Sequence, residues 1–327
     1  MQLPFAFDAP VRCYLHHAYA TGIFAAATRR GETCLDYANL ELRRGDAYSG
    51  EPDFLDFNPY TDLGTLALRG RVSLHDHPAV ASLRTFNGPT FCRHVAACVR
   101  AGAYVCVHLD AFYAPWSAAH AQAHRSTKHL VIGHEGGIFI GANYRADGSF
   151  GSCCMPGEQL WPSVARQPEL QAPFTADQLI REVRILSGET PPPARTLLEQ
   201  RLGSFAASRP ADGAPAEPGY TYGIGCYLAI AEEVAAAVQY GCAVDLRKTR
   251  LLAERAAVLA AGLEHCLDLA HRHPALLGDW KQAAALLQAF HVSCCQHNLR
   301  RVRPAGVADL LHRAAALETA VIARILG

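Results

Sequence analysis

The sequence predicts an α+β fold in which a mixed domain is followed by a bundle of helices. Up to about residue 186, strand-like alternation and helical periodicity occur side by side, whereas from Tyr222 onward every segment has helical periodicity. The stretch between these parts is rich in Pro, Ala, Ser and Gly. We therefore predict a mixed domain over residues 1–186, a linker or surface excursion over 187–219, and a helical bundle over 220–327.

The composition narrows the class of protein. The chain has 327 residues, is 50% apolar, and carries 30 basic and 30 acidic side chains, so its formal net charge is zero. Without a run of like charges it lacks the basic surface that nucleic acid requires. It shows no basic leader and no stretch of about 20 apolar residues, so we expect no membrane partner and a cytoplasmic location. The 12 cysteines show no CxxC spacing, and we interpret most of them as buried thiols.

The first elements follow from local patterns. A helix is expected after Asp8, a candidate N-cap, with Pro10 in its first turn and Gly31 as its stop. Residues 88–102 have helical spacing and end on a glycine, and 103–113 read as a buried strand. A loop or short helix over 114–129 leads into a hairpin that turns on Gly136 and Gly137.

The last third of the chain repeats an amphipathic helical pattern. An apolar stripe recurs through residues 245–267, and Pro274 closes that segment. Residues 278–299 and 307–326 show the same periodicity. Three or four such helices predict a bundle.

Cys13 differs from the other cysteines because it falls near the predicted start of a helix. The dipole and the free N–H groups at a helix N-terminus favour the thiolate, which is the form that attacks a carbonyl. Arg12 adds a neighbouring cation. We therefore expect Cys13 to be a nucleophile; Cys34 and Cys92, also near helix starts, are its competitors.

A base and its orienting group are expected at the two ends of the hairpin. His129 begins one strand and Asn143 ends the next, and in an antiparallel hairpin these ends lie side by side. The Asn side chain would then hold the imidazole while the other ring nitrogen faces the thiol, with Asp147 as a competitor for that role. Cysteine, histidine and asparagine in these positions form a papain-like constellation.

The segment VCVHLDAFYAPWSAAHAQAHRSTKHLVIGHEGGIFIGANY resembles the butirosin biosynthesis protein H family of the papain-like cysteine-peptidase superfamily. The resemblance covers about residues 5 to 150. Its motif positions are Asp110, Tyr113, Pro115, His124, His129 and Gly133. The sequence departs from the family at Ala114, which is usually Leu, and at Asn143, where many relatives have Asp. Phe7 stands where papain-like enzymes carry an oxyanion-hole Gln, and Gln2 is the nearest alternative. The family's Ser-Glu and Gly-rich stretch after the helix is missing.

The resemblance implies a papain-like acyltransferase. Such an enzyme moves an acyl or aminoacyl group from a carrier-protein thioester to its cysteine and then to a small-molecule amine, as in specialised-metabolite biosynthesis. Asp110, Tyr113 and His124 are then expected to bind substrate. No cofactor is expected apart from the phosphopantetheine arm of the carrier protein, and the linker and bundle are candidates for covering the cleft, for forming a homodimer or for receiving the carrier.

Three other readings stay open. A peptidase or amidase would use the same residues with water as acceptor, and a docking protein of a biosynthetic assembly line would keep the fold without activity. A metal hydrolase would use histidines such as His75 and His77 in LHDHP, but the remaining ligands of such a site are not recognisable in the sequence, so we expect no metal.

Overall fold

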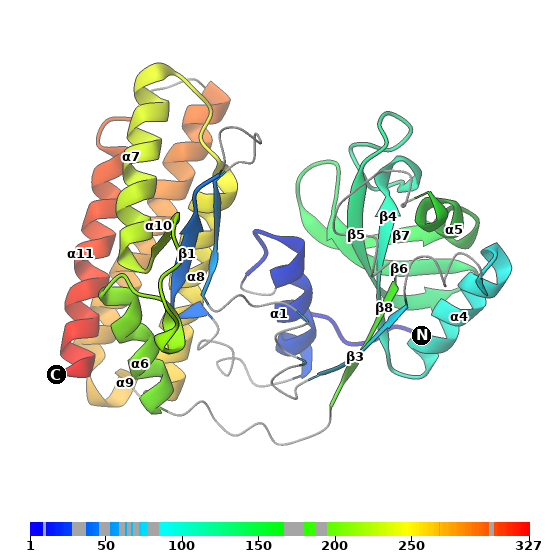
Figure 1. The fold of residues 1–327 in the computed structure, drawn as a ribbon, viewed down its shortest axis with the longest axis horizontal. Helices are drawn as coiled ribbons and strands as arrows, with labels where there is room; N and C mark the ends of the chain where they lie inside the picture. Colours follow the sequence, from blue (N-terminus) through cyan, green and yellow to red (C-terminus); the bar gives the residue numbers. More distant parts are fainter. Residues whose placement is uncertain are drawn as a thin grey trace. The chain divides into compact units, whose positions relative to one another are not determined.

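The structure, a computed structural model, is of the α+β class. It describes residues 1–8, 11–27, 37–45, 53–58, 63, 67, 72–77, 85–166, 180–186, 195–267, 269–300 and 304–327. Within these ranges, two antiparallel sheets and a set of helices form two compact units (Figure 1). Unit 1 comprises Met1–Ala9, Ala18–Ala27 and Asp62–Thr190, and unit 2 comprises Pro10–His17, Thr28–Thr61 and Pro191–Gly327.

The two units are interleaved along the chain. The boundary between them falls inside helix α1 (Leu15–Ala27), after His17, and residues 28–61 are grouped with the C-terminal part of the chain. The sequence had suggested consecutive ranges, because periodicity does not report which distant segments pack together. The division at 186 and 219 stays a prediction.

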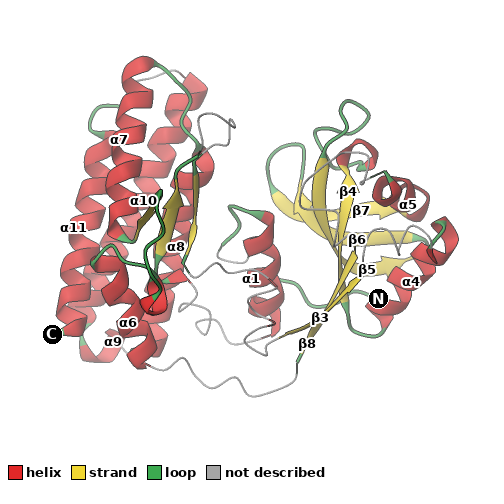
Figure 2. Ribbon diagram, viewed as in Figure 1, coloured by secondary structure: helices red, strands yellow, loops and turns green. Residues whose placement is uncertain are grey.

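Unit 1 is built on a six-stranded sheet (Figure 2). The strands lie in the order β3-β8-β4-β5-β6-β7, and every neighbouring pair is antiparallel. Their bounds are β3 (Val72–His77), β4 (Tyr104–Asp110), β5 (Ser126–Glu135), β6 (Ile138–Tyr144), β7 (Phe150–Pro156) and β8 (Ile180–Ile185). A 3-10 turn, η2 (Ala111–Tyr113), follows β4, and helix α5 (Gly157–Ala165) follows β7.

The predicted hairpin is the β5–β6 pair. Gly136 and Gly137 turn with φ of 55° and 81°, values that glycine adopts without steric cost. Leu130 pairs with Ala142, and one step further along that register His129 stands opposite Asn143. The sequence therefore predicted the turn and the alignment of His129 with Asn143, although β5 begins at Ser126 and β6 ends at Tyr144, so neither residue is the end of its strand.

The sequence predicted helix α4 (Gly88–Arg100) and its glycine stop, and the structure adds an N-terminal cap. Asn87 and Thr90 form a reciprocal capping box, with distances of 3.0 Å from Thr90 N to Asn87 Oδ1 and 2.8 Å from Asn87 N to Thr90 Oγ1. The buried face carries Phe91 and Val95 against the sheet. The chain leaves the helix through Gly102, whose φ is 80°.

Unit 2 combines a small sheet with several helices. The sheet has the order β2-β1-β9, and α7, α8, α10 and α11 run side by side (Figure 1). The bounds are β1 (Leu40–Arg43), β2 (Phe54–Phe57), β9 (Tyr220–Tyr222), α6 (Arg195–Ala206), η4 (Ala211–Gly213), α7 (Ile224–Tyr240), α8 (Leu246–Cys266), α9 (Leu269–Arg272), α10 (Pro274–Arg300) and α11 (Val307–Leu326).

Part of the predicted linker is a packed helix. Helix α6 lies inside the range 187–219, and its Leu198, Leu202 and Phe205 are buried in the core of unit 2. The Pro, Ala and Gly content of the flanking residues hid this i, i+4, i+7 pattern, which tertiary burial stabilises. Residues 187–194 of the predicted linker lie outside the described residues.

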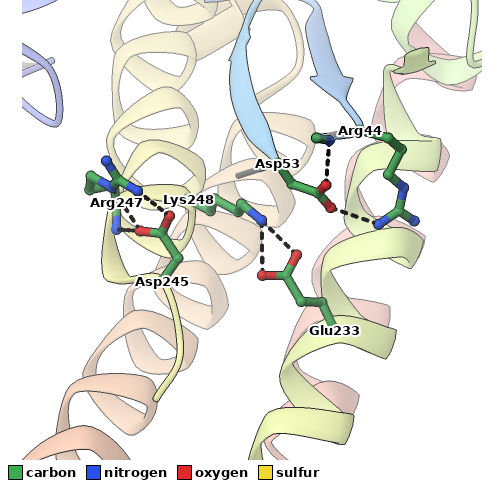
Figure 3. Close-up of polar contacts among 7 residues, drawn as sticks. Arg44, Asp53, Glu233, Asp245, Arg247 and Lys248 are labelled. Atoms are coloured by element: carbon green, nitrogen blue, oxygen red, sulfur yellow. Dashed lines mark hydrogen bonds and ion pairs between the residues drawn. The ribbon is translucent and has the colours of Figure 1, made fainter. Parts of the chain in front are cut away.

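Figure 3 shows one ion pair between the residues that follow β1 and precede β2, and two others at the start of α8. Arg44 Nη1 lies 2.9 Å from Asp53 Oδ2, and Lys248 Nζ lies 2.7 Å from a carboxylate oxygen of Glu233 on α7. Asp245 is the N-cap of α8, where its carboxylate accepts from the backbone of Arg247 and also pairs with that side chain. The Lys248–Glu233 ion pair fixes the N-terminal end of α8 beside α7.

Another ion pair, Arg255–Glu318, is fully buried in unit 2. Arg255 Nη1 donates to Glu318 Oε2 at 2.7 Å and to Tyr227 Oη at 3.0 Å, and Tyr227 in turn donates to Glu318 Oε1 at 2.9 Å. The same guanidinium donates to the Ala38 carbonyl and lies 3.9 Å from the ring centroid of Phe205. One side chain of α8 thus connects α11, α7, α6 and Ala38, two residues before β1.

The described helices include none that has both the length and the apolar character needed to cross a bilayer.

Candidate functional site

Cys13 precedes α1 instead of lying inside it. The helix begins at Leu15, two residues later than the predicted nucleophile. The backbone N–H groups of Arg12 and Cys13 both donate to Glu254 Oε2 of α8, at 2.7 and 2.9 Å. Asp8, which the sequence predicted as the N-cap, is therefore not the N-cap of this helix. The carboxylate that accepts the backbone N–H groups just before the helix is that of Glu254, which is distant in sequence.

The surroundings of Cys13 hold its thiol in the protonated form. Burial is the main cause of a raised pKa, and the negative charges of Glu254 and Asp56 raise the pKa further, against a smaller opposing effect of Arg250. The thiol belongs to the core of unit 2 and is 7% exposed. The prediction of a lowered pKa is wrong for this arrangement, because two carboxylates and burial outweigh the helix terminus.

His129 lies in β5 and is completely buried. Its ring stacks on Trp116 with 4.4 Å between centroids, and neither ring nitrogen has a hydrogen-bond partner among the described residues. Burial lowers the pKa of this imidazole to about 3. The ring occupies the space above Gly141, where an added Cβ would lie 2.3 Å from Nε2. His129 is thus a neutral imidazole with its hydrogen-bonding capacity unused.

Asn143 does not bond to the ring of His129. Its Nδ2 donates to the Lys128 carbonyl at 2.7 Å, and its Oδ1 accepts from the backbone N–H of Tyr144 at 2.8 Å. The Lys128 carbonyl also accepts from Tyr19 Oη of α1 at 2.9 Å. The strand alignment brings Asn143 opposite His129, as the sequence predicted, but the short amide side chain is used by the backbone.

The three residues expected to bind substrate form a local cluster. Asp110 caps η2 through Phe112 N at 3.0 Å, and its Oδ2 lies 2.6 Å from Nδ1 of His124. The ring of His124 stacks on Phe112 at 4.4 Å, and Tyr113 lies beside both rings. Asp110 is completely buried whereas the His124 side chain is 44% exposed, so this pair presents one polar edge to solvent.

The competing cysteines and the alternative oxyanion donor have their own places. Cys92 lies in α4 with its thiol 3.3 Å from the Gly157 carbonyl, and burial raises its pKa. It lines a groove of about 670 Å³ beside the hairpin turn, which none of the predicted site residues lines. Gln2 is exposed and forms a β-bridge with Gly133. Cys34 lies outside the described residues.

Sequence reasoning missed a pair of histidines next to Cys13. His17 Nε2 lies 2.6 Å from Asp56 Oδ1, and His16 Nε2 lies 3.3 Å from Asp56 Oδ2 and 3.1 Å from His17 Nε2. Burial opposes ionisation of Asp56, but the charge of His17 and the hydrogen bonds from both rings lower its pKa to about 2. The separation of three and four residues from Cys13 was the available signal, but the partner Asp56 is distant in sequence.

Two groups of side chains within the described ranges have donor atoms close enough together to bind one metal ion. The first is His16, His17 and Asp56 in unit 2, and the second is His77, His94 and Glu182 in unit 1. In each group the donor atoms lie within 4.8 Å of one another.

The predicted catalytic residues are divided between the units. Cys13 belongs to unit 2, whereas His129 and Asn143 belong to unit 1. Inside unit 1, the Lys128 carbonyl joins Asn143 to Tyr19 of α1. Inside unit 2, Glu254 contacts Cys13 directly and Asp56 acts on it electrostatically.

Comparison with known proteins adds no relative: no protein-family model matches the chain, and no curated protein sequence matches it.

Proposed function

We propose that the chain is a cysteine-dependent acyltransferase with a papain-like domain and a C-terminal helical bundle. It would take an acyl or aminoacyl group from a carrier-protein thioester and pass it to an amine through an acyl-Cys13 intermediate. The observation that carries this proposal is the pair of backbone N–H groups at Arg12 and Cys13, which converge on one anionic oxygen.

The distances of this pair are those of an oxyanion hole. Donors in such a site stand about 2.7–3.1 Å from the oxygen that becomes negative in the tetrahedral intermediate. The two N–H groups stand 2.7 and 2.9 Å from Glu254 Oε2. Two N–H groups that accommodate an anionic oxygen next to a thiol support the proposal, because acyl transfer to that thiol requires such donors.

The proposed reaction has two steps. The proposed base takes the proton of the Cys13 thiol, and the thiolate attacks the thioester carbonyl. A new C–S bond forms, the bond to the phosphopantetheine sulfur breaks, and the base returns the proton to that sulfur, so the carrier leaves as its thiol. The amine then attacks the acyl-cysteine, loses its proton to a base, and releases Cys13. His129 is the proposed base, with Asn143 holding its strand end; both nitrogens of this buried imidazole have no described partner, which supports a role beyond packing.

A second assignment of the base rests on residues in the same unit as Cys13. His17 is held by Asp56 at 2.6 Å, which is the base-and-carboxylate pairing that nucleophile triads use. Under this assignment Asp56 would orient His17, and His129 would have a structural role. One substitution at each histidine distinguishes the two assignments.

Mass spectrometry of the intact protein tests the function. The chain is incubated with an acyl-pantetheine thioester, and the adduct is mapped by proteolysis. We expect one acyl group on Cys13, no adduct in Cys13→Ser, and an unchanged adduct in the matched control Cys92→Ser. An adduct on Cys34 or Cys92, or none at all, would contradict the proposal.

Two further measurements separate the remaining readings. Release of the acyl group to an added amine faster than to water favours a transferase over a peptidase or amidase. A loss of acylation rate in His129→Gln but not in His17→Gln selects His129 as the base, and the opposite result selects the His17–Asp56 pair. Circular dichroism of each variant confirms that it is folded.

A further inference from the structure

The edge of the sheet in unit 1 gathers side chains that the proposed acyl transfer does not use. His77 ends the edge strand β3, Glu182 lies in its neighbour β8, and His94 and Cys98 lie in α4. His94 and Cys98 are four residues apart in a helix, so they share one face. Three separate elements therefore contribute to one small volume.

The donor atoms surround one carboxylate oxygen. His77 Nε2 lies 2.8 Å and His94 Nε2 lies 3.2 Å from Glu182 Oε1. The Cys98 sulfur lies 3.6 Å from His94 Nε2. Bonds of about 2.0–2.3 Å in a tetrahedral zinc site place neighbouring ligand atoms roughly 3.3–3.8 Å apart. The donor atoms of His77, His94 and Glu182 already lie within 4.8 Å of one another, and the Cys98 side chain would turn from His94 toward the other two donors to complete the site.

The register of the two strands directs these side chains to the helix. His75 pairs with Glu182 and Asp76 pairs with Arg181, so His77 and Glu182 are on one face of the sheet and the Asp76–Arg181 ion pair is on the other. That ion pair has two short contacts, 2.6 and 2.9 Å, and holds the register. Arg184 Nη2 approaches the second oxygen of Glu182 at 3.8 Å.

The chemistry of the donor set selects the kind of ion. Two imidazoles and a thiol are ligands that zinc prefers, whereas calcium and magnesium prefer oxygen. The side chains of His77, His94 and Glu182 are 20%, 26% and 11% exposed, which leaves a path for an ion from solvent.

We propose that His77, His94, Cys98 and Glu182 bind one divalent ion of the zinc type that fastens β3 and β8 to α4. Four protein ligands leave no open position for a substrate, so the site is structural and not a hydrolase centre. Among the described strands, β3 pairs with β8 alone. An ion joining it to the helix adds a constraint to an edge strand of the sheet.

Metal content and spectroscopy test this site on the full chain. The protein is stripped with a chelator and reloaded with Zn²⁺ for elemental analysis, or with Co²⁺ for absorption spectroscopy. We expect tight binding of one equivalent, a tetrahedral cobalt spectrum, and a thiolate-to-cobalt charge-transfer band. That band reports a sulfur ligand in the unaltered protein, so the test does not depend on any variant folding.

Substitutions assign the ligands. Cys98→Ser removes the charge-transfer band, and His94→Ala weakens metal binding by more than the roughly 10- to 100-fold that loss of an outer-shell partner costs. The matched control is His75→Ala, next to His77 on the same strand face, which keeps full binding. His16→Ala keeps the charge-transfer band, because that residue belongs to the other cluster.

Three results would overturn the proposal. The first is a wild-type chain that binds no tight equivalent of zinc or cobalt. The second is a cobalt complex whose sulfur band survives in Cys98→Ser. The third is loss of the tight equivalent in His16→Ala with its retention in His94→Ala.

Discussion

The buried pair Arg255–Glu318 provides the sharpest test of how unit 2 is stabilised. Both side chains are completely buried, and their charged atoms lie 2.7 Å apart. Removing one partner of a buried pair leaves the other charge without compensation and costs about 3–5 kcal/mol. Replacing both partners by neutral side chains avoids that cost, so the two substitutions are expected to be strongly non-additive.

The perturbation is Glu318→Gln, which keeps the size of the side chain and its hydrogen bond with Tyr227 but removes the charge. We expect the free energy of unfolding to fall by about 3–5 kcal/mol. For a unit of about 150–250 residues each kcal/mol shifts the melting temperature by about 2–4 °C, so the melting temperature falls by about 6–20 °C. The second variant, Arg255→Met with Glu318→Gln, loses less stability than Glu318→Gln alone.

Urea unfolding followed by circular dichroism measures both free energies, and equal slopes show that the comparison is valid. The matched control is Asp279→Asn, which breaks the largely exposed pair with Arg324 between α10 and α11. That variant should change stability by less than about 1 kcal/mol. A double variant that loses as much stability as Glu318→Gln alone, or more, would refute the reasoning, as would a change below about 1 kcal/mol in Glu318→Gln.

Three more predictions concern the candidate site. Glu254→Gln removes a charge that raises the pKa of Cys13 and replaces a charged hydrogen-bond acceptor by a neutral one, a difference of about 1–1.5 kcal/mol. We therefore expect alkylation of Cys13 at neutral pH to accelerate about tenfold, and an unchanged rate would contradict this expectation. Gly141→Ala places a Cβ against the His129 ring and lowers the melting temperature, whereas Gly278→Ala, where a Cβ meets nothing within 4 Å, does not. Burial lowers the pKa of His129 to about 3, so between about pH 3 and 6.5 the unfolded chain binds more protons than the folded chain, and stability increases as the pH rises through this range. The slope of the unfolding free energy against pH is expected to decrease in His129→Phe. An identical slope in this variant would show that the ring does not control the pH dependence.

Short-range features of the fold were predictable from the sequence. The turn at Gly136 and Gly137, the alignment of the β5–β6 strand ends and helix α4 with its glycine stop each depend on residues close together in the chain. The apolar stripe of α8 likewise forms a buried face, which includes Leu252, Leu259 and Leu263. Backbone conformation and local periodicity are sufficient for such features.

Features that depend on distant partners were not predictable. The start of α1 and the raised pKa of Cys13 depend on Glu254, which is 241 residues away in the chain. In the same way, His94 and Cys98 looked like one face of an ordinary helix until Glu182 on β8 joined them. A single sequence states which side chains are present on a face but not which charge will be placed against it.

Glu254 connects the electrostatics of Cys13 with the proposed chemistry. Its Oε2 accepts from the two N–H groups that would hold an oxyanion, while its Oε1 accepts from Arg250 Nε at 2.8 Å. In the proposed mechanism a thioester carbonyl takes the place of Oε2, and Arg250 retains the displaced carboxylate through a pair one helical turn away. Moving this negative charge away from the sulfur also lowers the thiol pKa, so occupation of the oxyanion position and activation of the nucleophile would occur together.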